Sequence, residues 1–210
     1  MRGFAARDGE AVAGLDEDER LVIARIVADV GLLLGGEAFG VDERERRPQR
    51  EDLAEALRFL DGIGDALVEP DDPALLRLLP NASPTDREVA EEFRRLTQED
   101  LRATKLERLR RLWEDLSAEG DDWVVPADQV MATAAALTDV RLVVASRLGL
   151  DSDEDAEALH RDIAAASVTL KHASAAETGI DPERLWLGML YDALTWLQES
   201  LVSLTLGGTE

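Results

Sequence analysis

The sequence predicts an all-α fold, a bundle-like domain of roughly eight helices with a small N-terminal β-hairpin. Apolar residues recur with the helical period along most of the chain, capping residues precede these segments, and Gly or Pro follows them. No series of strand-like segments alternates with them, which argues against a parallel sheet. We expect residues 1–210 to form a single helical domain, since 210 residues can bury one well-packed core.

The N-terminal segment carries the clearest local signals. Residues 1–15 are expected to form the hairpin, because Asp8-Gly9 separates two short runs and both residue types tolerate the positive φ of a two-residue turn. Asp16 then stands three residues before Glu19, which is the spacing of a capping box. Two consecutive glycines end the apolar run that follows, so this run is predicted to be the first helix.

The remaining helices are predicted from similar signals, with Ser83 and Thr97 each expected to begin one. Two stretches rich in charge, Gly and Pro, 36–51 and 61–73, are expected to be exposed connectors. The expected helices are 21–34, 51–60, 75–79, 83–96, 97–116, 127–148, 152–171 and 181–207.

Composition excludes several classes of function. The formal net charge is −22, which disfavours contact with the nucleic-acid backbone unless cations gather on one face. The chain has no cysteine, so disulfides, thiolate metal sites and thiol catalysis are excluded. Neither a signal peptide nor a membrane-spanning run is recognisable, and we therefore expect a cytoplasmic protein that does not bind membranes.

Several charged residues fall on helix faces that are otherwise apolar. Placed at about 100° per residue, Arg102 and Lys105 lie within the apolar stripe of the expected helix 97–116. The expected helix 127–148 is apolar almost all round, yet it contains Asp139 and Arg141. Charges that leave water need partners. We therefore predict a buried ionic network that sets helix register, made by Arg102, Lys105, Asp139, Arg141 and Glu199.

The segment 94–111 concentrates positive charge. Two helices that meet at Thr97 could imitate a helix-turn-helix, although carboxylates occupy the start of the second helix, where a recognition helix contacts bases. A basic interaction face is expected from Arg94, Arg95, Arg108, Arg110 and Arg111.

Sites for catalysis or metals are not recognisable. The chain has two histidines, His160 and His172, and their spacing rules out a local pair of histidine ligands. The single Glu-x-x-His motif at Glu157 lacks the second copy that a carboxylate di-iron bundle needs. We therefore expect no catalytic residues, no metal ligands and no cofactor.

The acidic segment 151–162 is the one partial exception, because it resembles the first half of a calcium loop. Ala156 stands where such a loop requires glycine. Acidic residues at a helix N-terminus are also explained by capping and by the helix dipole. Calcium binding here is left as an open alternative.

Four separated blocks stand out along the chain: DPALLRLLP at 72–80, EFRRLTQEDLRATK at 92–105, LTDVRLVVASRLG at 137–149 and LYDALTWLQESLV at 190–202. In this order they resemble an actinobacterial family of domains of unknown function, number two thousand and seventeen. The resemblance implies a helical cytoplasmic protein that self-associates, is often encoded near a Clp-protease adaptor, and is linked to an oxidative-stress transcriptional regulator. Without cysteine, a thiol-based redox switch cannot operate in this member.

The resulting expectation is a non-enzymatic regulatory or adaptor protein that binds other proteins. We expect a homodimer formed through its long apolar helices. One alternative is a DNA-contacting transcriptional regulator that uses the basic segment 94–111. A second alternative is a metal- or ligand-dependent enzyme.

Overall fold

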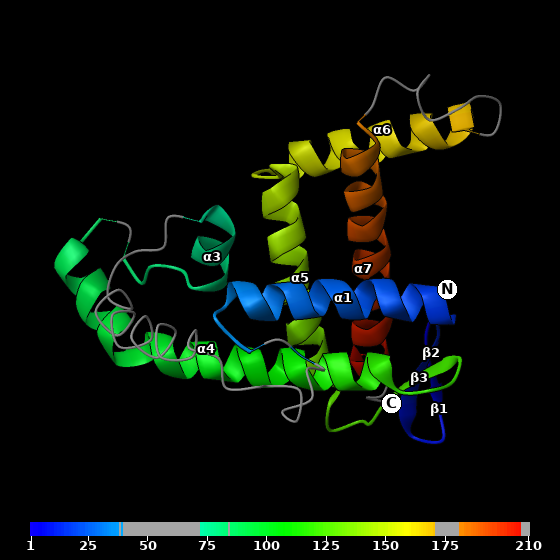
Figure 1. Ribbon diagram of the computed structural model, residues 1–210, viewed down its shortest axis with the longest axis horizontal. Helices are drawn as coiled ribbons and strands as arrows, with labels where there is room; N and C mark the ends of the chain where they lie inside the picture. The colour runs from blue at the N-terminus through cyan, green and yellow to red at the C-terminus, as the bar shows by residue number, and fades with distance from the viewer. Residues whose placement is uncertain (38, 40–71, 84, 171–180, 207–210) are drawn as a thin grey trace, which may run out of the picture.

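The computed structural model describes residues 1–37, 39, 72–83, 85–170 and 181–206. Two layers of helices make up its body, and a small sheet lies at one end (Figure 1). In chain order the elements are β1 (Arg2–Arg7), β2 (Glu10–Gly14), α1 (Glu17–Leu33), α3 (Pro73–Leu78), α4 (Arg87–Ser117), β3 (Asp122–Val125), α5 (Val130–Leu148), α6 (Asp153–Leu170) and α7 (Pro182–Leu206).

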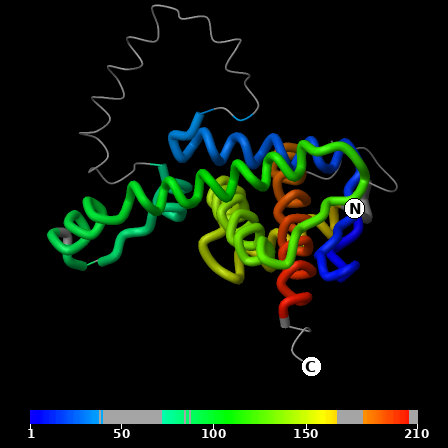
Figure 2. Tube along the Cα trace, turned by 90° about the horizontal axis from the view of Figure 1, so that it is seen from below, coloured from blue at the N-terminus to red at the C-terminus, as the bar shows by residue number. Residues whose placement is uncertain are grey.

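The two layers cross each other. Helices α1 and α4 lie side by side and run in opposite directions, and they pass across α5 and α7, which also lie side by side (Figures 1 and 2). Helix α3 packs on α5, and α6 packs against α7 near its N-terminal end. The N-terminal half of α4 extends beyond the body of the molecule in both views.

The predicted hairpin is present, and a third strand that was not predicted extends it. Asp8 and Gly9 have φ angles of 55° and 86°, as a tight hairpin turn requires. The sheet order is β1-β2-β3 with antiparallel neighbours, and Ala11 pairs with Val125. The short segment 122–125 pairs with a strand far away in sequence, so it has no local hairpin signal.

The expected number of helices is wrong for the described part of the chain, which contains six. The expected helices 83–96 and 97–116 are one continuous helix, α4. The Thr97 hydroxyl donates a hydrogen bond to the Phe93 carbonyl (2.8 Å) within this helix instead of capping a new one. The N-cap of α4 is Asp86, not Ser83. The expected helix 51–60 and most of the connectors 36–51 and 61–73 lie outside the described residues.

Other helix ends follow the predicted signals. Asp16 and Glu19 form the reciprocal hydrogen bonds of a capping box, so α1 begins at Glu17. Gly149 ends α5 with a φ of 70°, in the left-handed region that favours glycine. Among the helices of the described ranges, none is long and apolar enough to cross a bilayer.

The hydrophobic core lies between the helix layers and continues under the sheet. Leu190, Leu194, Leu197 and Leu201 of α7 are buried in it. Phe4 of β1 packs edge-on against Trp123 of β3, with ring centroids 4.9 Å apart, and so joins the sheet to this core.

One charged side chain is buried at the junction of α1, α4 and β3. Arg20 has a relative exposure of 4% and lies on the apolar stripe of α1, beside Ile23, Ala24 and Val27. Its guanidinium donates hydrogen bonds to the backbone carbonyls of Asp115 (2.7 Å), Leu116 (3.1 Å), Gly120 (2.7 Å) and Asp122 (3.2 Å). Arg20 therefore satisfies carbonyl groups that the end of α4 leaves without partners inside the helix.

We predict that Arg20→Met lowers the free energy of unfolding by about 3 kcal/mol, because it leaves several buried carbonyls without donors. Urea denaturation followed by circular dichroism measures this loss. The matched control is Arg25→Met on the exposed part of the same helix, which should leave stability nearly unchanged. Equal effects of the two substitutions would contradict the role assigned to Arg20.

Candidate functional site

A buried ion pair joins α4 to α5. Lys105 donates a hydrogen bond to Asp139 Oδ1, and both side chains are largely shielded from solvent. Among the described residues, no donor reaches Asp139 Oδ2. Burial raises the pKa of Asp139, although Lys105 and, more weakly, Arg108 oppose the change. The pair holds the two helices in register at the cost of desolvating a carboxylate.

A second polar cluster joins α5 to α7. Arg141 donates to Gln198 Oε1 (2.6 Å), and its guanidinium lies 5.3 Å from the centre of the Tyr191 ring. The Gln198 amide in turn donates to the Thr138 hydroxyl (2.6 Å) and the Ala134 carbonyl (3.0 Å). These groups therefore align α5 with α7.

The five residues of the predicted network are not assembled in one place. Lys105 and Asp139 meet as expected, but Arg141 turns to Gln198 instead. Glu199 is exposed, because one further residue rotates the side chain by about 100°, away from α5. Arg102 lies near the end of α1, with Nη1 3.2 Å from the point that a Cβ on Gly35 would occupy.

The predicted basic face is also not a single face. Placed at about 100° per residue, the five arginines surround α4 with no gap wider than about 100°. Two of them pair with carboxylates on the same helix, Arg95 with Glu92 (2.8 Å) and Arg111 with Glu107 (3.0 Å). Arg110 lies over the ring of Phe39, Arg94 bonds to Asn81, and Arg108 lies close enough to Asp139 to affect its pKa. Since α4 is also continuous at residue 97, the helix-turn-helix interpretation has no structural basis.

The acidic segment 151–162 begins as a capped helix. The Asp155 carboxylate accepts from the backbone N–H of Ser152 (2.9 Å), and the Asp155 N–H bonds to the Ser152 hydroxyl (3.2 Å). Asp151 pairs with Arg77 of α3. In the part of the chain that the structure describes, no three His, Asp or Glu side chains are grouped so that they could hold a metal ion. Capping accounts for the partial likeness to a calcium loop.

A groove of about 530 Å³ lies where α1 begins and α4 ends. Exposed carboxylates of Glu17, Glu119 and Asp121 line it, together with Leu21. Arg20 also contributes to its wall, but the guanidinium is already bonded to backbone carbonyls. The volume would suit a small molecule, but the polar groups are spread along exposed turns and the first turn of α1 rather than converging on one point.

The projecting half of α4 exposes three apolar side chains on one face. We name Val89, Phe93 and Leu96 the α4 apolar patch; their relative exposures lie between 47% and 61%. They fall within an arc of about 60° on the helix. The sequence predicts a helix over 83–96, but an apolar stripe is equally typical of a helix face buried in a core. Only the tertiary structure shows that this half of α4 extends beyond the core (Figure 1).

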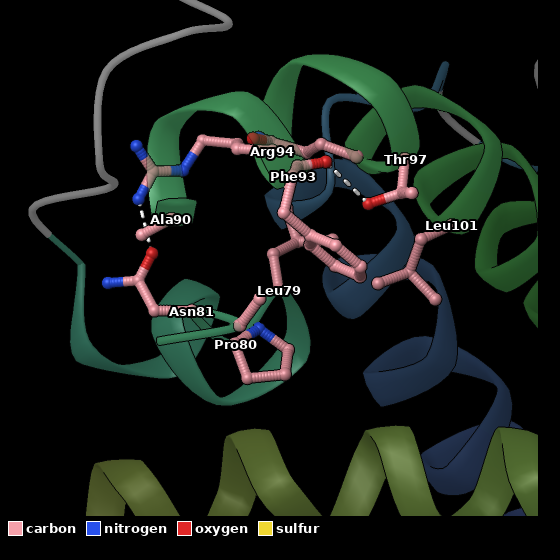
Figure 3. Close-up of a pocket in the computed structure, with 10 residues that line it drawn as sticks. Leu79, Pro80, Asn81, Ala90, Phe93, Arg94, Thr97 and Leu101 are labelled. Carbon is pink, nitrogen blue, oxygen red and sulfur yellow. Dashed lines mark hydrogen bonds between the residues drawn. The ribbon is translucent and has the colours of Figure 1, made fainter. Parts of the chain in front are cut away.

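A shallow pocket borders the α4 apolar patch (Figure 3). Phe93 and Leu101 face Leu79 and Pro80 across it, and Arg94 reaches the Asn81 side chain at its far end. Its free volume of about 20 Å³ has room for little more than one water molecule or methyl group. The pocket suits the tip of an apolar side chain from a partner rather than a metabolite.

We predict that the Lys105–Asp139 pair is strongly coupled. Lys105→Met should lower the free energy of unfolding by about 3 kcal/mol, because it leaves a buried carboxylate without its cation. The double variant Lys105→Met/Asp139→Leu should lie within about 1 kcal/mol of the wild type, since both charges are removed together. Urea denaturation of the wild type, both single variants and the double variant measures the coupling. Additive losses would contradict the pairing.

Stability should also depend on pH through Asp139. Burial raises its pKa above the ordinary value of 3.8, so the folded protein binds this proton more tightly than the unfolded chain. The contribution of protonated Asp139 to the free energy of unfolding is therefore complete below pH 3.8. It is lost as the pH rises through the raised pKa of Asp139. We predict that the stability of the wild type relative to Asp139→Asn falls as the pH rises above 3.8. Urea denaturation across this range measures it, and a relative stability that rises with pH would be the opposite result.

The comparisons with known proteins agree with the resemblance described above. The model of a family described as "Domain of unknown function (DUF2017)" matches residues 1–205. No curated protein and no solved structure matches the chain. Because the match covers nearly the whole chain, including both helix layers and the sheet, the protein belongs to the DUF2017 family.

Proposed function

We propose that this chain is a non-enzymatic regulatory or adaptor protein that acts by binding other proteins. The α4 apolar patch is the observation that carries this proposal. Single exposed apolar side chains are ordinary on soluble proteins, but three on one face of a projecting helix favour a binding surface. Val89, Phe93 and Leu96 have the spacing i, i+4 and i+7, which is typical of a helix that docks into an apolar groove.

The charges beside the patch indicate what kind of groove fits. Glu88 and Glu99 lie along one flank of the patch when α4 is placed at about 100° per residue, and Glu92 lies on the same flank in a pair with Arg95. A partner with an apolar groove and a rim of Lys or Arg would complement both the patch and this flank. The net charge of −22 would speed the encounter with such a basic partner.

An adaptor role also agrees with the contacts of the buried polar groups, which join helices to one another. Lys105 and Asp139 connect α4 to α5, and Arg141 and Gln198 connect α5 to α7. These contacts hold the helices in register. The exposed half of α4 takes no part in them and remains available to bind a partner. The proposal assigns no catalytic residue, metal or cofactor.

The regulatory part of the proposal comes from the family resemblance. That resemblance implies a cytoplasmic protein with a link to stress-responsive transcription, and both are kept here as proposals. Homodimer formation belongs to the same proposal.

Affinity capture from a native lysate, with variants, tests the proposal. The double variant Phe93→Glu/Leu96→Glu places charge in the patch and should lose proteins that the wild type retains, with at least about a tenfold drop in recovery. Leu21→Glu/Leu32→Glu on α1 is the matched control, because both leucines are exposed apolar residues outside the patch. It should retain the same proteins as the wild type. Identical capture by all three proteins would refute a binding role for the patch.

A further inference from the structure

Helix α6 is attached to the described body of the protein mainly through α7. Figure 1 shows α6 crossing the N-terminal half of α7, apart from the layer that α1 and α4 form. Leu159 and Ile163 of α6 lie against Gly188 of α7, where an added Cβ would come within 3.0 Å of each side chain. Because this apolar contact is small, a polar contact beside it can change how firmly α6 is held.

That polar contact joins His160 of α6 to Asp192 of α7. His160 Nε2 lies 3.0 Å from Asp192 Oδ1, and the two side chains have relative exposures of 54% and 29%. On the other side of the ring, Nδ1 lies 2.8 Å from the backbone carbonyl oxygen of Ala156. The contact with Asp192 is an ion pair rather than an aligned hydrogen bond, because Oδ1 has no hydrogen-bond partner among the described residues. The ring is exposed enough to exchange its protons with solvent.

The two oxygen atoms beside the ring determine how many protons it needs. A backbone carbonyl and an ionised carboxylate accept hydrogen bonds and cannot donate them. A neutral imidazole has one N–H, so it must turn an unprotonated nitrogen toward one of these two oxygens. The imidazolium form carries an N–H on both nitrogens and attracts both oxygens. The position of α6 on α7 therefore favours the charged form of His160.

The surroundings of Asp192 also favour a proton on this pair. Burial raises the pKa of Asp192, and His160 is the one described charge that opposes the change. Exposed carboxylates on the same helix faces add negative potential: Asp153 and Glu157 on α6 and Glu199 on α7. A proton that sits on Asp192 can be donated to the ring, so the two residues titrate as one unit.

Other described cations near these helices are already bonded elsewhere. Those of the elements that pack against α7, and of α7 itself, are Arg2 and Arg7 of β1, Arg141 and Arg147 of α5, Arg161 of α6 and Arg184 of α7. Tyr191, which precedes Asp192, lies with its hydroxyl 3.5 Å from Arg141 Nη2. Loss of the proton from His160 would therefore leave Asp192 without a described counter-charge.

We propose that His160 and Asp192 form a pH-sensitive contact that holds α6 on α7 when the pair is protonated and loosens α6 when the proton is lost. In the protonated form, opposite charges meet between the helices. Once the ring is neutral, Asp192 keeps a partly buried charge without a partner, so docking of α6 is less favourable. Loosening of α6 uncovers Leu159, Ile163 and the surface of α7 around Gly188. Protonation of the pair would then control the exposure of an apolar surface, a role beyond the proposed function.

Amide hydrogen exchange followed by NMR tests this contact, with protection factors corrected for the pH dependence of exchange in unstructured peptides. Imidazole groups lose their proton near neutral pH, so the comparison is between about pH 6 and about pH 8. In the wild type, protection of the Leu159 and Ile163 amides should be about fivefold greater at the lower pH.

Variants separate this contact from other effects of pH. His160→Gln and Asp192→Asn should each remove the pH dependence, because one partner no longer titrates. His160→Lys, which is charged at both pH values, should keep the higher protection at both. Asp162→Asn on the exposed side of α6 is the matched control and should behave like the wild type.

Circular dichroism checks that each variant folds, and either neutral variant serves if the other does not fold. Protection of α6 in the wild type that is constant, or that rises with pH, would overturn the proposal. A pH dependence that persists in the neutral variants would overturn it as well. None of these results bears on capture by the α4 apolar patch.

Discussion

The guanidinium of Arg20 connects α1, the end of α4 and the turn that leads into β3. A helix end normally needs a capping glycine or water for its last carbonyls, but α4 ends at Ser117 without a left-handed cap residue. Arg20, which belongs to the neighbouring helix α1, donates hydrogen bonds to these carbonyls instead. The direction of α4 is thereby held at one end, and with it the position of Lys105 against α5 and the projection of the α4 apolar patch beyond the core.

Features of the fold that depend on near neighbours could be predicted from the sequence. The turn at Asp8-Gly9 and the capping box at Asp16 involve residues within three positions of each other, and both are present. The third strand, which contains Trp123, forms only by pairing with β2, and about half of the chain lies between the two strands. No local pattern therefore indicates it. The single helix α4 was divided at Thr97 because a hydroxyl that can cap a helix can equally bond to the preceding turn.

The polar contacts between helices were predictable to the level of the helix face and no further. Lys105 and Asp139 stand on faces that are otherwise apolar, and they meet. Gln198 and Glu199 differ by one residue, and which of them faces α5 depends on the rotation of α7 in the packed structure. Arg20 had the same signal as Lys105, a cation within an apolar stripe, and placing α1 on a helical wheel would have identified it.

The sheet gathers strands from distant parts of the chain, and this affects the order of events during synthesis. The hairpin leaves the ribosome first, but Phe4 has no aromatic partner until Trp123 follows. The other side of β1 stays open longer still, until Ser200 arrives on the last helix to be made. The first strands produced are thus the last to be enclosed, so a nascent chain halted before α7 would display an unprotected sheet edge to the folding machinery of the cell.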